Sequence, residues 1–457
     1  MKTLAKLFGA ALFTAAAALF ITGGATPRQP QPQNGAASLA AGAWTQAAVT
    51  VAGFPVRGVA HGLDGNAGQV APGNVSGVSW ASVSAGAGHT VAITTTGELW
   101  AWGDNFAGQL GLGDSGWGTY RNIPTRVGSA NNWTSVAAGE MRTLAITANG
   151  ELWAWGSNLL GRLGLGDDGG PGTDRSIPTR VDAANNWASA SLDNWSSVAI
   201  TTNGELWAWG QPGLEGLEGF GELNINTPTR VGTANNWASV SVGGGGTMAI
   251  TTNGELWAWG NNGSGELGLG DNTWRNMPTR VGYRSDWVSV STSSWDFEEG
   301  DFTIRGAFTL AVTANGELWA WGSNFAGQLG LGDSGWDTNR NTPTRVGDRS
   351  DWVSVSTSER GRGHSFAVTA NGELWAWGSN GSGELGLGDN LDRNAPTRVG
   401  SANNWASVAA GSFHTVAITT TGELWAWGGN GLGELGLGDS GWDTGRNTPT
   451  RVGGTSN

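Results

Sequence analysis

The sequence predicts an all-β protein, a seven-bladed β-propeller made of four-stranded antiparallel blades. One observation is a heptapeptide, Gly-Glu-Leu-Trp-Ala-Trp-Gly, that recurs about every 50 to 60 residues; its copies start at Gly97, Gly150, Gly204, Gly254, Gly316, Gly372 and Gly422. A second is that each module holds the same four short sequence landmarks in the same order, two of them joined by a tight turn. A third is that no helical apolar periodicity occurs outside the first 25 residues. Seven such units favour a closed ring of blades.

The four predicted strands have the same landmarks in every module. The first strand opens with Trp-x-Ser, at Trp80, Trp133, Trp187, Trp237, Trp287, Trp352 and Trp405. The second is an apolar run such as Thr90-Val91-Ala92-Ile93, and the third is Glu-Leu-Trp-Ala-Trp. The fourth is Pro-Thr-Arg-Val, with prolines at positions 124, 178, 228, 278, 343, 396 and 449.

The second and third strands are predicted to form a hairpin. The turn between them is Asn-Gly in five modules and Thr-Gly in the other two, at Thr96-Gly97 and Thr421-Gly422. Asn-Gly between apolar runs is a strong hairpin signal, because both turn residues need a positive φ. In the third strand, side-chain alternation puts Trp100 and Trp102 on one face and Leu99 on the other. Apolar groups on both faces suit a blade covered by two neighbours.

The ends of the ring leave two closures open. Pro72-Gly73-Asn74-Val75 resembles the fourth-strand landmark, so an N-terminal strand could complete the last blade. The alternative is seven self-contained blades.

The N-terminus reads as an export signal. Residues 1–25 combine Lys2 and Lys6 with a 15-residue apolar core, Leu7 to Ile21, and a small-residue cleavage site. Residues 26–65 are predicted to be a flexible spacer, and residues 66–457 the propeller. We expect a secreted or periplasmic, soluble and monomeric protein without a membrane span after cleavage; an uncleaved anchor is the alternative.

Composition excludes several chemistries. The chain has no cysteine, so disulfides and thiolate metal sites are excluded, and four scattered histidines make a zinc site weak. A net charge of −13, with lysine only in the leader, disfavours nucleic acid as a partner. We expect no catalytic residues, no metal and no cofactor.

The stretch Gly86 to Gly113 carries Gly-x-x-His-Thr, Leu-Trp-x-Trp-Gly and Gly-Gln-Leu-Gly-x-Gly in order. It resembles the repeat of the regulator of chromosome condensation family, over about residues 66–454. The resemblance implies a seven-bladed propeller and, from the founding member, nucleotide exchange on a small GTPase. The leader and the acidic composition argue against that activity. The loops at 86–90, 139–143 and 193–197 lack the Gly-Trp-Arg-His-Thr runs of plant ultraviolet-B photoreceptors of this fold.

Specific function is expected where modules differ. The fifth module carries 12 extra residues between its first and second strands, within Thr292 to Gly306, and the sixth carries three around Arg360-Gly361-Arg362. The first and third loops of antiparallel blades leave on the same rim, so an acidic-aromatic insert is expected beside a basic one. The predicted partner-binding residues are Trp195, Trp295, Phe297, Glu298, Glu299, Asp301, Phe302, Arg305, Arg360 and Arg362.

Tryptophans of the third loops extend this rim: Trp117, Trp274, Trp336 and Trp442. Exposed aromatics gathered on one face are typical of binding surfaces. The alternative is that these indoles cap their own blades. The sequence therefore predicts an exported, non-enzymatic protein that binds a protein partner. The alternatives are a glycan-binding or adhesive module, an enzyme working in the central channel, and an exchange factor for a small GTPase.

Overall fold

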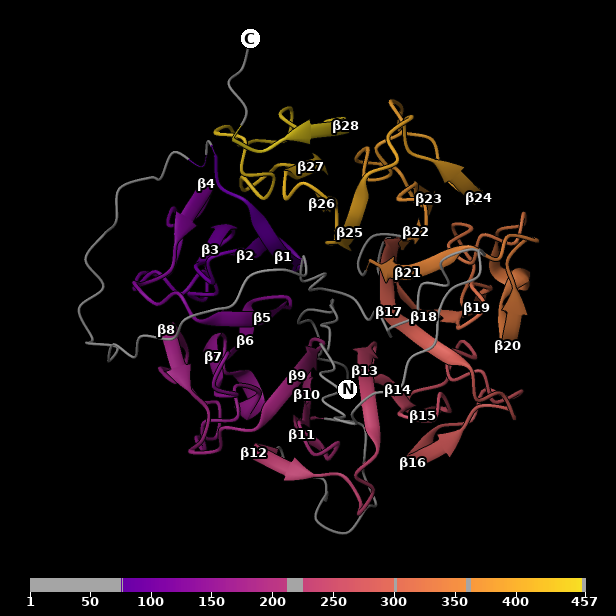
Figure 1. Cartoon of the computed structure of the whole chain (residues 1–457), viewed down its shortest axis with the longest axis horizontal. Helices are drawn as coiled ribbons and strands as arrows, with labels where there is room; N and C mark the ends of the chain where they lie inside the picture. Colours follow the sequence, from indigo (N-terminus) through magenta and orange to yellow (C-terminus); the bar gives the residue numbers. More distant parts are fainter. Residues whose placement is uncertain (1–74, 76, 212–224, 300–301, 359–362, 454–457) are drawn as a thin grey trace, which may run out of the picture.

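Seven four-stranded antiparallel sheets stand around a common axis in the computed structural model (Figure 1). The structure describes residues 75, 77–211, 225–299, 302–358 and 363–453, and for residues 294–305 only the backbone of those that lie in strands. The predicted leader and spacer lie outside the described residues. In every sheet the strand order follows the chain, as in β1-β2-β3-β4. The predicted seven-bladed propeller is confirmed.

The first strand of each blade lies nearest the axis and contacts the first strands of its neighbours (Figure 1). These strands are β1 (Trp80–Ala85), β5 (Trp133–Ala138), β9 (Trp187–Leu192), β13 (Trp237–Gly243), β17 (Trp287–Glu299), β21 (Trp352–Thr357) and β25 (Trp405–Ala410). The second strands are β2 (His89–Thr94), β6 (Arg142–Thr147), β10 (Ser196–Thr201), β14 (Gly246–Thr251), β18 (Phe302–Thr313), β22 (His364–Thr369) and β26 (His414–Thr419).

The third strands hold the repeated Leu-Trp-Ala-Trp-Gly, and the fourth strands form the outer edge. The third strands are β3 (Leu99–Gly103), β7 (Leu152–Gly156), β11 (Leu206–Gly210), β15 (Leu256–Gly260), β19 (Leu318–Gly322), β23 (Leu374–Gly378) and β27 (Leu424–Gly428). The fourth strands are β4 (Arg121–Arg126), β8 (Arg175–Arg180), β12 (Ile225–Arg230), β16 (Arg275–Arg280), β20 (Arg340–Arg345), β24 (Arg393–Arg398) and β28 (Arg446–Arg451). Two 3-10 turns, η1 (Leu159–Gly161) and η2 (Trp336–Thr338), complete the described elements. None of the helices in the described part has the length and apolar character to cross a bilayer.

The core consists of one apolar cluster at each blade-to-blade interface. Trp102 belongs to the cluster that faces the seventh blade, whereas Leu99 and Ala101 belong to the cluster that faces the second. The first-strand Trp80 meets Trp100 and Trp102 edge to face, with ring centroids 6.1 and 6.2 Å apart. The predicted alternation of the third strand is therefore confirmed, and burial of these rings is the main attraction between blades.

A backbone carbonyl of each third loop joins its blade to the next. The carbonyl of Glu434 accepts hydrogen bonds from Trp102 Nε1 at 2.9 Å and from Thr90 Oγ1 at 3.0 Å. A Cβ on Gly436 would lie 2.8 Å from that indole nitrogen, so only glycine fits beside the bond. Six of the seven interfaces have the indole bond. At the interface of the third and fourth blades, the matching part of the third loop lies outside the described residues.

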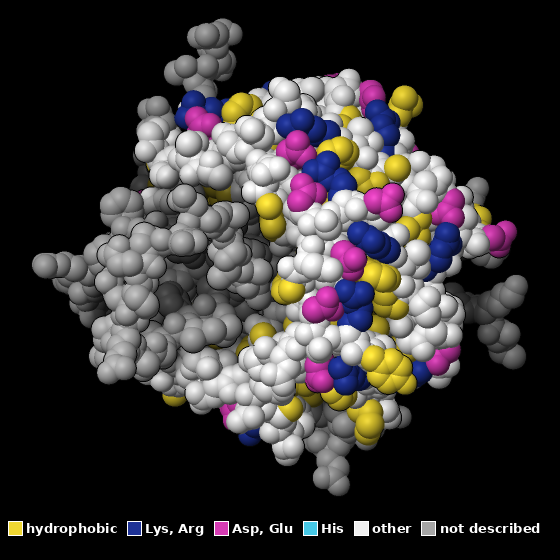
Figure 2. Space-filling view, turned by 45° about the vertical axis from the view of Figure 1, so that its right-hand side comes forward, with side chains coloured by type: hydrophobic (Ala, Val, Ile, Leu, Met, Phe, Trp, Pro, Cys, Tyr) yellow, Lys and Arg dark blue, Asp and Glu magenta, His cyan; other side chains and the backbone are white. Residues whose placement is uncertain are grey.

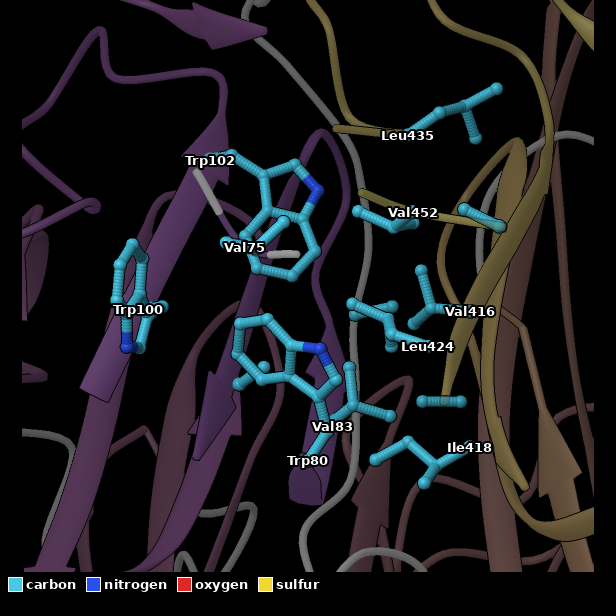
Figure 3. Close-up of a cluster of buried hydrophobic side chains, with 14 residues drawn as sticks. Val75, Trp80, Val83, Trp100, Trp102, Val416, Ile418, Leu424, Leu435 and Val452 are labelled. Atoms are coloured by element: carbon cyan, nitrogen blue, oxygen red, sulfur yellow. The ribbon is translucent and has the colours of Figure 1, made fainter. Parts of the chain in front are cut away.

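Among the described residues, the ring closes between the first and seventh blades with no strand exchanged. The strand β28 completes the seventh sheet, so the self-contained alternative holds. The backbone N–H of Trp80 donates to the carbonyl of Gly422 at 2.9 Å. The N–H of Trp133 donates in the same way to the carbonyl of Gly97 between the first and second blades, which are consecutive in sequence. Figure 3 shows Trp80 and Trp102 from the first blade against Val416 and its neighbours from the seventh, with Val75 beside them.

Serine hydroxyls connect the inner strands. Ser84 Oγ accepts from the backbone N–H of Ala138 in the next blade at 3.0 Å, and four further interfaces have the same bond. The other two interfaces have alanine, Ala137 and Ala409, at the serine position. These two junctions, one of them the closing junction, therefore lack this bond.

The fourth strands form the exposed edge of each sheet, and ion pairs lie along them. The arginine of Pro-Thr-Arg-Val pairs with the glutamate of Gly-Glu-Leu-Trp in every blade, as Arg126 does with Glu98 at 3.1 Å. Figure 2 shows basic and acidic side chains side by side along this outer surface. Proline and charge on an edge strand both oppose strand-to-strand aggregation. The repeated glutamate thus has a structural role.

Candidate interaction rim

The first and third loops of each blade lie on one edge of the ring, which we call the loop rim. The register shows this directly, because His89 at the start of the second strand pairs with Gly103 at the end of the third. The two loops also touch: the N–H of Asp104 donates to the carbonyl of Gly88 at 2.7 Å, and that of Gln211 to Trp195 at 2.8 Å. The predicted placement of both loop sets on one rim is confirmed.

A buried asparagine organises the third loops. In the first blade, Asn105 Nδ2 donates to the Asp114 carboxylate at 2.8 Å and to Thr119 Oγ1 at 3.2 Å, while its Oδ1 accepts from the N–H of Leu110 at 3.0 Å. Arg121 at the start of the outer strand completes the loop by an ion pair with Asp114 at 2.5 Å. The same contacts recur around Asn324 and Asn430.

The apolar side chains at the tips of these loops point to solvent. Trp117 is 91% exposed and Trp442 96%, so neither indole caps its own blade. Trp274 is 61% exposed and Trp336 50%, the latter against Phe325 with ring centroids 4.3 Å apart. Leu391, 66% exposed, is the exposed apolar side chain of this loop in the sixth blade, although its backbone contacts are those that Thr273, next to Trp274, makes in the fourth. The third-loop residues predicted from the sequence are all tryptophans and so do not include Leu391. Its position shortly after Gly-Asp in the third loop could have identified it.

Trp195 lies in the first loop of the third blade and is half-buried. The buried Asp193 holds this loop, because its Oδ1 accepts from the N–H groups of Trp195 and Ser196 and its Oδ2 from Gly245 of the next blade at 3.1 Å. Trp195 is therefore on a rigid loop that opens onto the rim.

The insert of the fifth module continues the sheet instead of forming a separate loop. Strands β17 and β18 pair residue by residue from Ser289↔Val312 out to Glu299↔Phe302, while the matching hairpins have six- or seven-residue strands. We call the extension, positions 294–299 and 302–305, the ribbon. Its base contacts both neighbouring blades: the N–H of Thr292 donates to Ser241 Oγ at 2.9 Å, and Ser293 Oγ donates to the carbonyl of Ser358 at 3.1 Å.

The strand register shows which of the predicted binding positions share a face of the ribbon. Trp295 is opposite Gly306 and Phe297 opposite Ile304, whereas Asp296 is opposite Arg305. Opposite residues share a face, so the aromatic positions continue the face of Phe308, which packs toward the sixth blade. The acidic positions 296 and 298 share the other face. Asp301, Arg360 and Arg362 lie outside the described residues.

The basic insert begins next to the ribbon, as expected. Ser358, the last described residue before it, is the one that Ser293 contacts, and a Cβ on Gly363 just after it would lie 3.1 Å from Phe308. The two lengthened segments therefore start from adjacent points on the same rim.

Neutral histidines line the layer beneath the rim. Thr143 Oγ1 donates its proton to the carbonyl of Gln109 at 2.9 Å, so it accepts from His89 Nε2 at 3.1 Å. Likewise, Thr90 Oγ1 donates to the carbonyl of Glu434 and accepts from His414 Nε2 at 3.0 Å. Burial lowers the pKa of His89, His364 and His414 to about 3, so these rings stay uncharged at neutral pH. In each ring one nitrogen is hydrogen-bonded to a Thr or Ser hydroxyl and the other has no hydrogen-bond partner among the described residues.

Buried acids and arginines occupy the rest of this layer. Burial raises the pKa of Glu266, Glu384 and Glu434 to about 7. Burial lowers the pKa of Arg142 and of Arg162, and each guanidinium donates to backbone carbonyls of the Asp193–Ser196 loop. Among the described residues, no three His, Asp or Glu side chains gather as a metal site. The rim thus offers rigid aromatic and charged groups for recognition.

Comparison with known proteins agrees with this architecture. Models of the regulator of chromosome condensation (RCC1) repeat match residues 96–146, 149–200, 253–295, 315–368 and 371–418, and a second model of the repeat matches 80–109, 133–162, 237–266 and 405–434. The ultraviolet-B receptor UVR8 of Arabidopsis thaliana is 31% identical over 324 residues, which cover 69% of this chain and 68% of the receptor. The mitochondrial RCC1 domain-containing protein RUG3 of the same plant is 29% identical over 323 residues, 69% of this chain and 57% of that protein.

Solved structures share the fold. Prp20p from Saccharomyces cerevisiae, a protein described with its binding to Gsp1p and histones, superposes with a TM-score of 0.63 at 24% identity, over 78% of this chain and 86% of the yeast chain. Human WBSCR16 gives 0.62 at 21% identity, over 78% and 93%. From its repeats, its blades and its relatives, the chain belongs to the regulator of chromosome condensation (RCC1) repeat family.

Proposed function

We propose that this protein is an exported, non-enzymatic binding protein that recognises a protein partner through the loop rim. The observation that carries the proposal is the ribbon: one module of seven extends its inner hairpin beyond the ring and anchors the base on both neighbours. A paired hairpin has little conformational freedom to lose on binding. Export rests on the leader-like residues 1–25.

The construction of the scaffold supports recognition rather than catalysis. Residues common to all modules are engaged in packing, hydrogen bonds or ion pairs, as the indole of Trp102 and the carboxylate of Glu98 are. The distinguishing residues lie on the rim, where Trp195 supplies an aromatic group on a fixed loop. Aromatic anchors flanked by charges are typical of protein interfaces. Prp20p, which shares the fold, is described as binding proteins, and we propose a protein partner here too.

The test exploits the repeat itself. Residues 293–307 are replaced by Gly-Ala-Gly, the first loop of module one at 86–88, which shortens the hairpin to the length used elsewhere in the ring. Partners are captured from the extracellular fluid of the source cells with the full chain and with the variant, and are identified by mass spectrometry. Circular dichroism and tryptophan fluorescence check the fold of the variant.

We expect the short-loop variant to lose partners that the full chain captures. Equal capture by both proteins would exclude the ribbon as the recognition element. A variant with Trp195→Ala then asks whether the first loop of the third blade contributes separately. Secretion is checked by expressing the full chain with and without residues 1–25 and measuring the protein in the medium.

A further inference from the structure

The described surface of this protein has no unpaired cation. Each arginine that reaches solvent in the described part forms an ion pair with Asp or Glu. The two without such a pair, Arg142 and Arg162, are 1% and 4% exposed. The only lysines of the sequence are Lys2 and Lys6. In the described part of the chain, the arginines that reach solvent are therefore paired with carboxylates and form no unpaired basic patch.

The third loops present a row of apolar side chains on this acidic background. Blades four, five, six, seven and one follow one another around the ring, and each holds one large apolar side chain at its loop tip: Trp274, Trp336, Leu391, Trp442 and Trp117. In the second blade the segment after Gly166-Asp167 reads Asp-Gly-Gly-Pro-Gly at 168–172 and holds no large apolar side chain, although Leu159 near the start of the same loop is 49% exposed. The row thus follows one arc of the loop rim.

Two members of the row have an exposed carboxylate as the next residue. Asp337 follows Trp336 and Asp443 follows Trp442, and neither aspartate forms an ion pair with a described residue, although Arg340 and Arg446 lie three residues further on. Those arginines are held by Asp333 and Asp439 at 2.6 Å, which leaves the second carboxylate of each loop for a ligand.

The loop geometry keeps each indole available. In the seventh blade the residue next to the indole is Gly431, and Trp442 is 96% exposed; in the first blade the same position is Phe106, which contacts Trp117 with ring centroids 5.2 Å apart while Trp117 stays 91% exposed. In the fifth blade Phe325 packs against Trp336, and that indole is 50% exposed. The backbone that carries each indole is fixed by the buried asparagine, Asn430 or Asn324, so binding orders little that is not already ordered.

We propose that this row binds a basic, extended polypeptide segment of the partner, whose lysine or arginine side chains lie over Trp442 and Trp336 and pair with Asp443 and Asp337. An indole face attracts ammonium and guanidinium groups, and tryptophan does so best among aromatic residues. Among the described residues, Arg340 and Arg446 beside these indoles are each neutralised by a carboxylate, so a cationic segment meets no unpaired described cation there. This inference rests on the proposed recognition of a protein through the loop rim and specifies the chemistry of that partner.

The direct test measures binding of a fluorescent twelve-residue peptide of alternating lysine and glycine to the purified full chain by anisotropy. The same peptide with glutamate in place of lysine is the charge control. We expect Trp442→Leu, which keeps an apolar side chain but removes the π face, to weaken binding of the lysine peptide about five-fold. Asp443→Asn should weaken it by a similar factor and reduce its dependence on salt.

The matched control is Tyr283→Leu, since Tyr283 is 97% exposed but lies in the connection between blades, away from the loop rim. It should bind the lysine peptide as the unmodified chain does. Equal binding by Trp442→Leu and the unmodified chain would overturn the inference. A second pattern would also overturn the inference: Trp442→Leu loses binding, Asp443→Asn has no effect, and neutral oligosaccharides compete with the peptide. That outcome would assign the row to glycan binding.

The inference and the proposed function fail in different ways. If the short-loop variant loses its captured partner while Trp442→Leu and Asp443→Asn retain both partner and lysine peptide, the rim recognises a protein but the row does not bind its basic segment. If the variants weaken peptide binding and the short-loop variant captures the same proteins as the full chain, the row is the recognition element and the ribbon is not.

Discussion

Replacing Glu266 by glutamine tests the buried acids of the layer beneath the rim. Glu266 is 1% exposed, and its Oε2 accepts a hydrogen bond from the N–H of Ser264 at 2.7 Å. Its backbone carbonyl accepts the indole bond from Trp321 Nε1 of the next blade at 2.8 Å. Glutamine already occupies this place in two other blades, where Gln109 Oε1 accepts from the N–H of Ala107 at 2.9 Å. The substitution therefore keeps the shape of the side chain and its hydrogen bond to a backbone N–H, and it removes only the titrating carboxyl group.

The expected magnitude follows from the pKa. Burial raises the pKa of Glu266 from 4.5 to about 7, so between these values the folded state holds a proton that the unfolded state has released. The stabilisation from this proton is fully present below pH 4.5 and is lost as pH rises toward 7. With 1.36 kcal/mol per pKa unit, the loss amounts to about 3 kcal/mol at pH 8. Glu266→Gln should be up to about 3 kcal/mol more stable than the unmodified chain at pH 8 and equal to it at pH 4.

The assay is urea unfolding followed by tryptophan fluorescence, from pH 4 to pH 8.5, for both proteins. The reverse substitution, Gln328→Glu in the next blade, installs the same group and should add a loss of stability with rising pH. A Glu266→Gln protein whose free energy of unfolding falls with pH as steeply as that of the unmodified chain would refute the reasoning, as would a Gln328→Glu protein with no added pH dependence.

Three further predictions concern the ring. Gly436→Ala should lower the free energy of unfolding by about 2 kcal/mol or more, because the new Cβ would lie 2.8 Å from the Trp102 indole at a residue with a left-handed backbone. The control is Gly118→Ala, where the backbone is also left-handed but no atom lies near the new Cβ; it should cost only about 1 kcal/mol. Ser84→Ala should cost about 1 kcal/mol in urea unfolding without loss of fold, because it removes one bond between inner strands; an unchanged midpoint would show that the bond adds nothing. The pKa of His414 is lowered to about 3, so its contribution to stability is present above pH 6.5 and lost as pH falls toward 3. His414→Phe should therefore lose less stability than the unmodified chain when Tm is compared at pH 7 and pH 5, and an equal or larger loss would contradict the assignment.

Much of the architecture could be predicted because its causes are local. The Asn-Gly and Thr-Gly turns, the two-faced third strand and the edge proline each act within a few residues, and seven copies gave the same result. Trp102 and Leu99 were assigned to opposite faces by alternation alone, and the clusters on either side of the first blade agree. The rim tryptophans followed from the antiparallel order of the strands.

Other features depend on contacts between modules. The burial of Glu266, which is Gln, Glu or Arg in different modules, depends on the next blade closing over it and not on its neighbours in sequence. The choice between the two ring closures was settled by β28, which supplies the fourth strand of the seventh blade, and the junction itself joins residues at opposite ends of the ring, such as Trp80 and Gly422. The insert was placed between the first and second strands of its module, and the structure adds that it continues their pairing out to Glu299↔Phe302, above a base that Thr292 and Ser293 join to two other blades.

The sequence by itself determined the blade, since period-two alternation and glycine turns act over a span of residues that the chain brings together without help. Only the tertiary structure decided how the ring closes, which polar groups lose their water, and which indoles stay exposed at the rim. The physical reason is that burial is a property of the space between blades, and that space exists only once all the blades stand side by side.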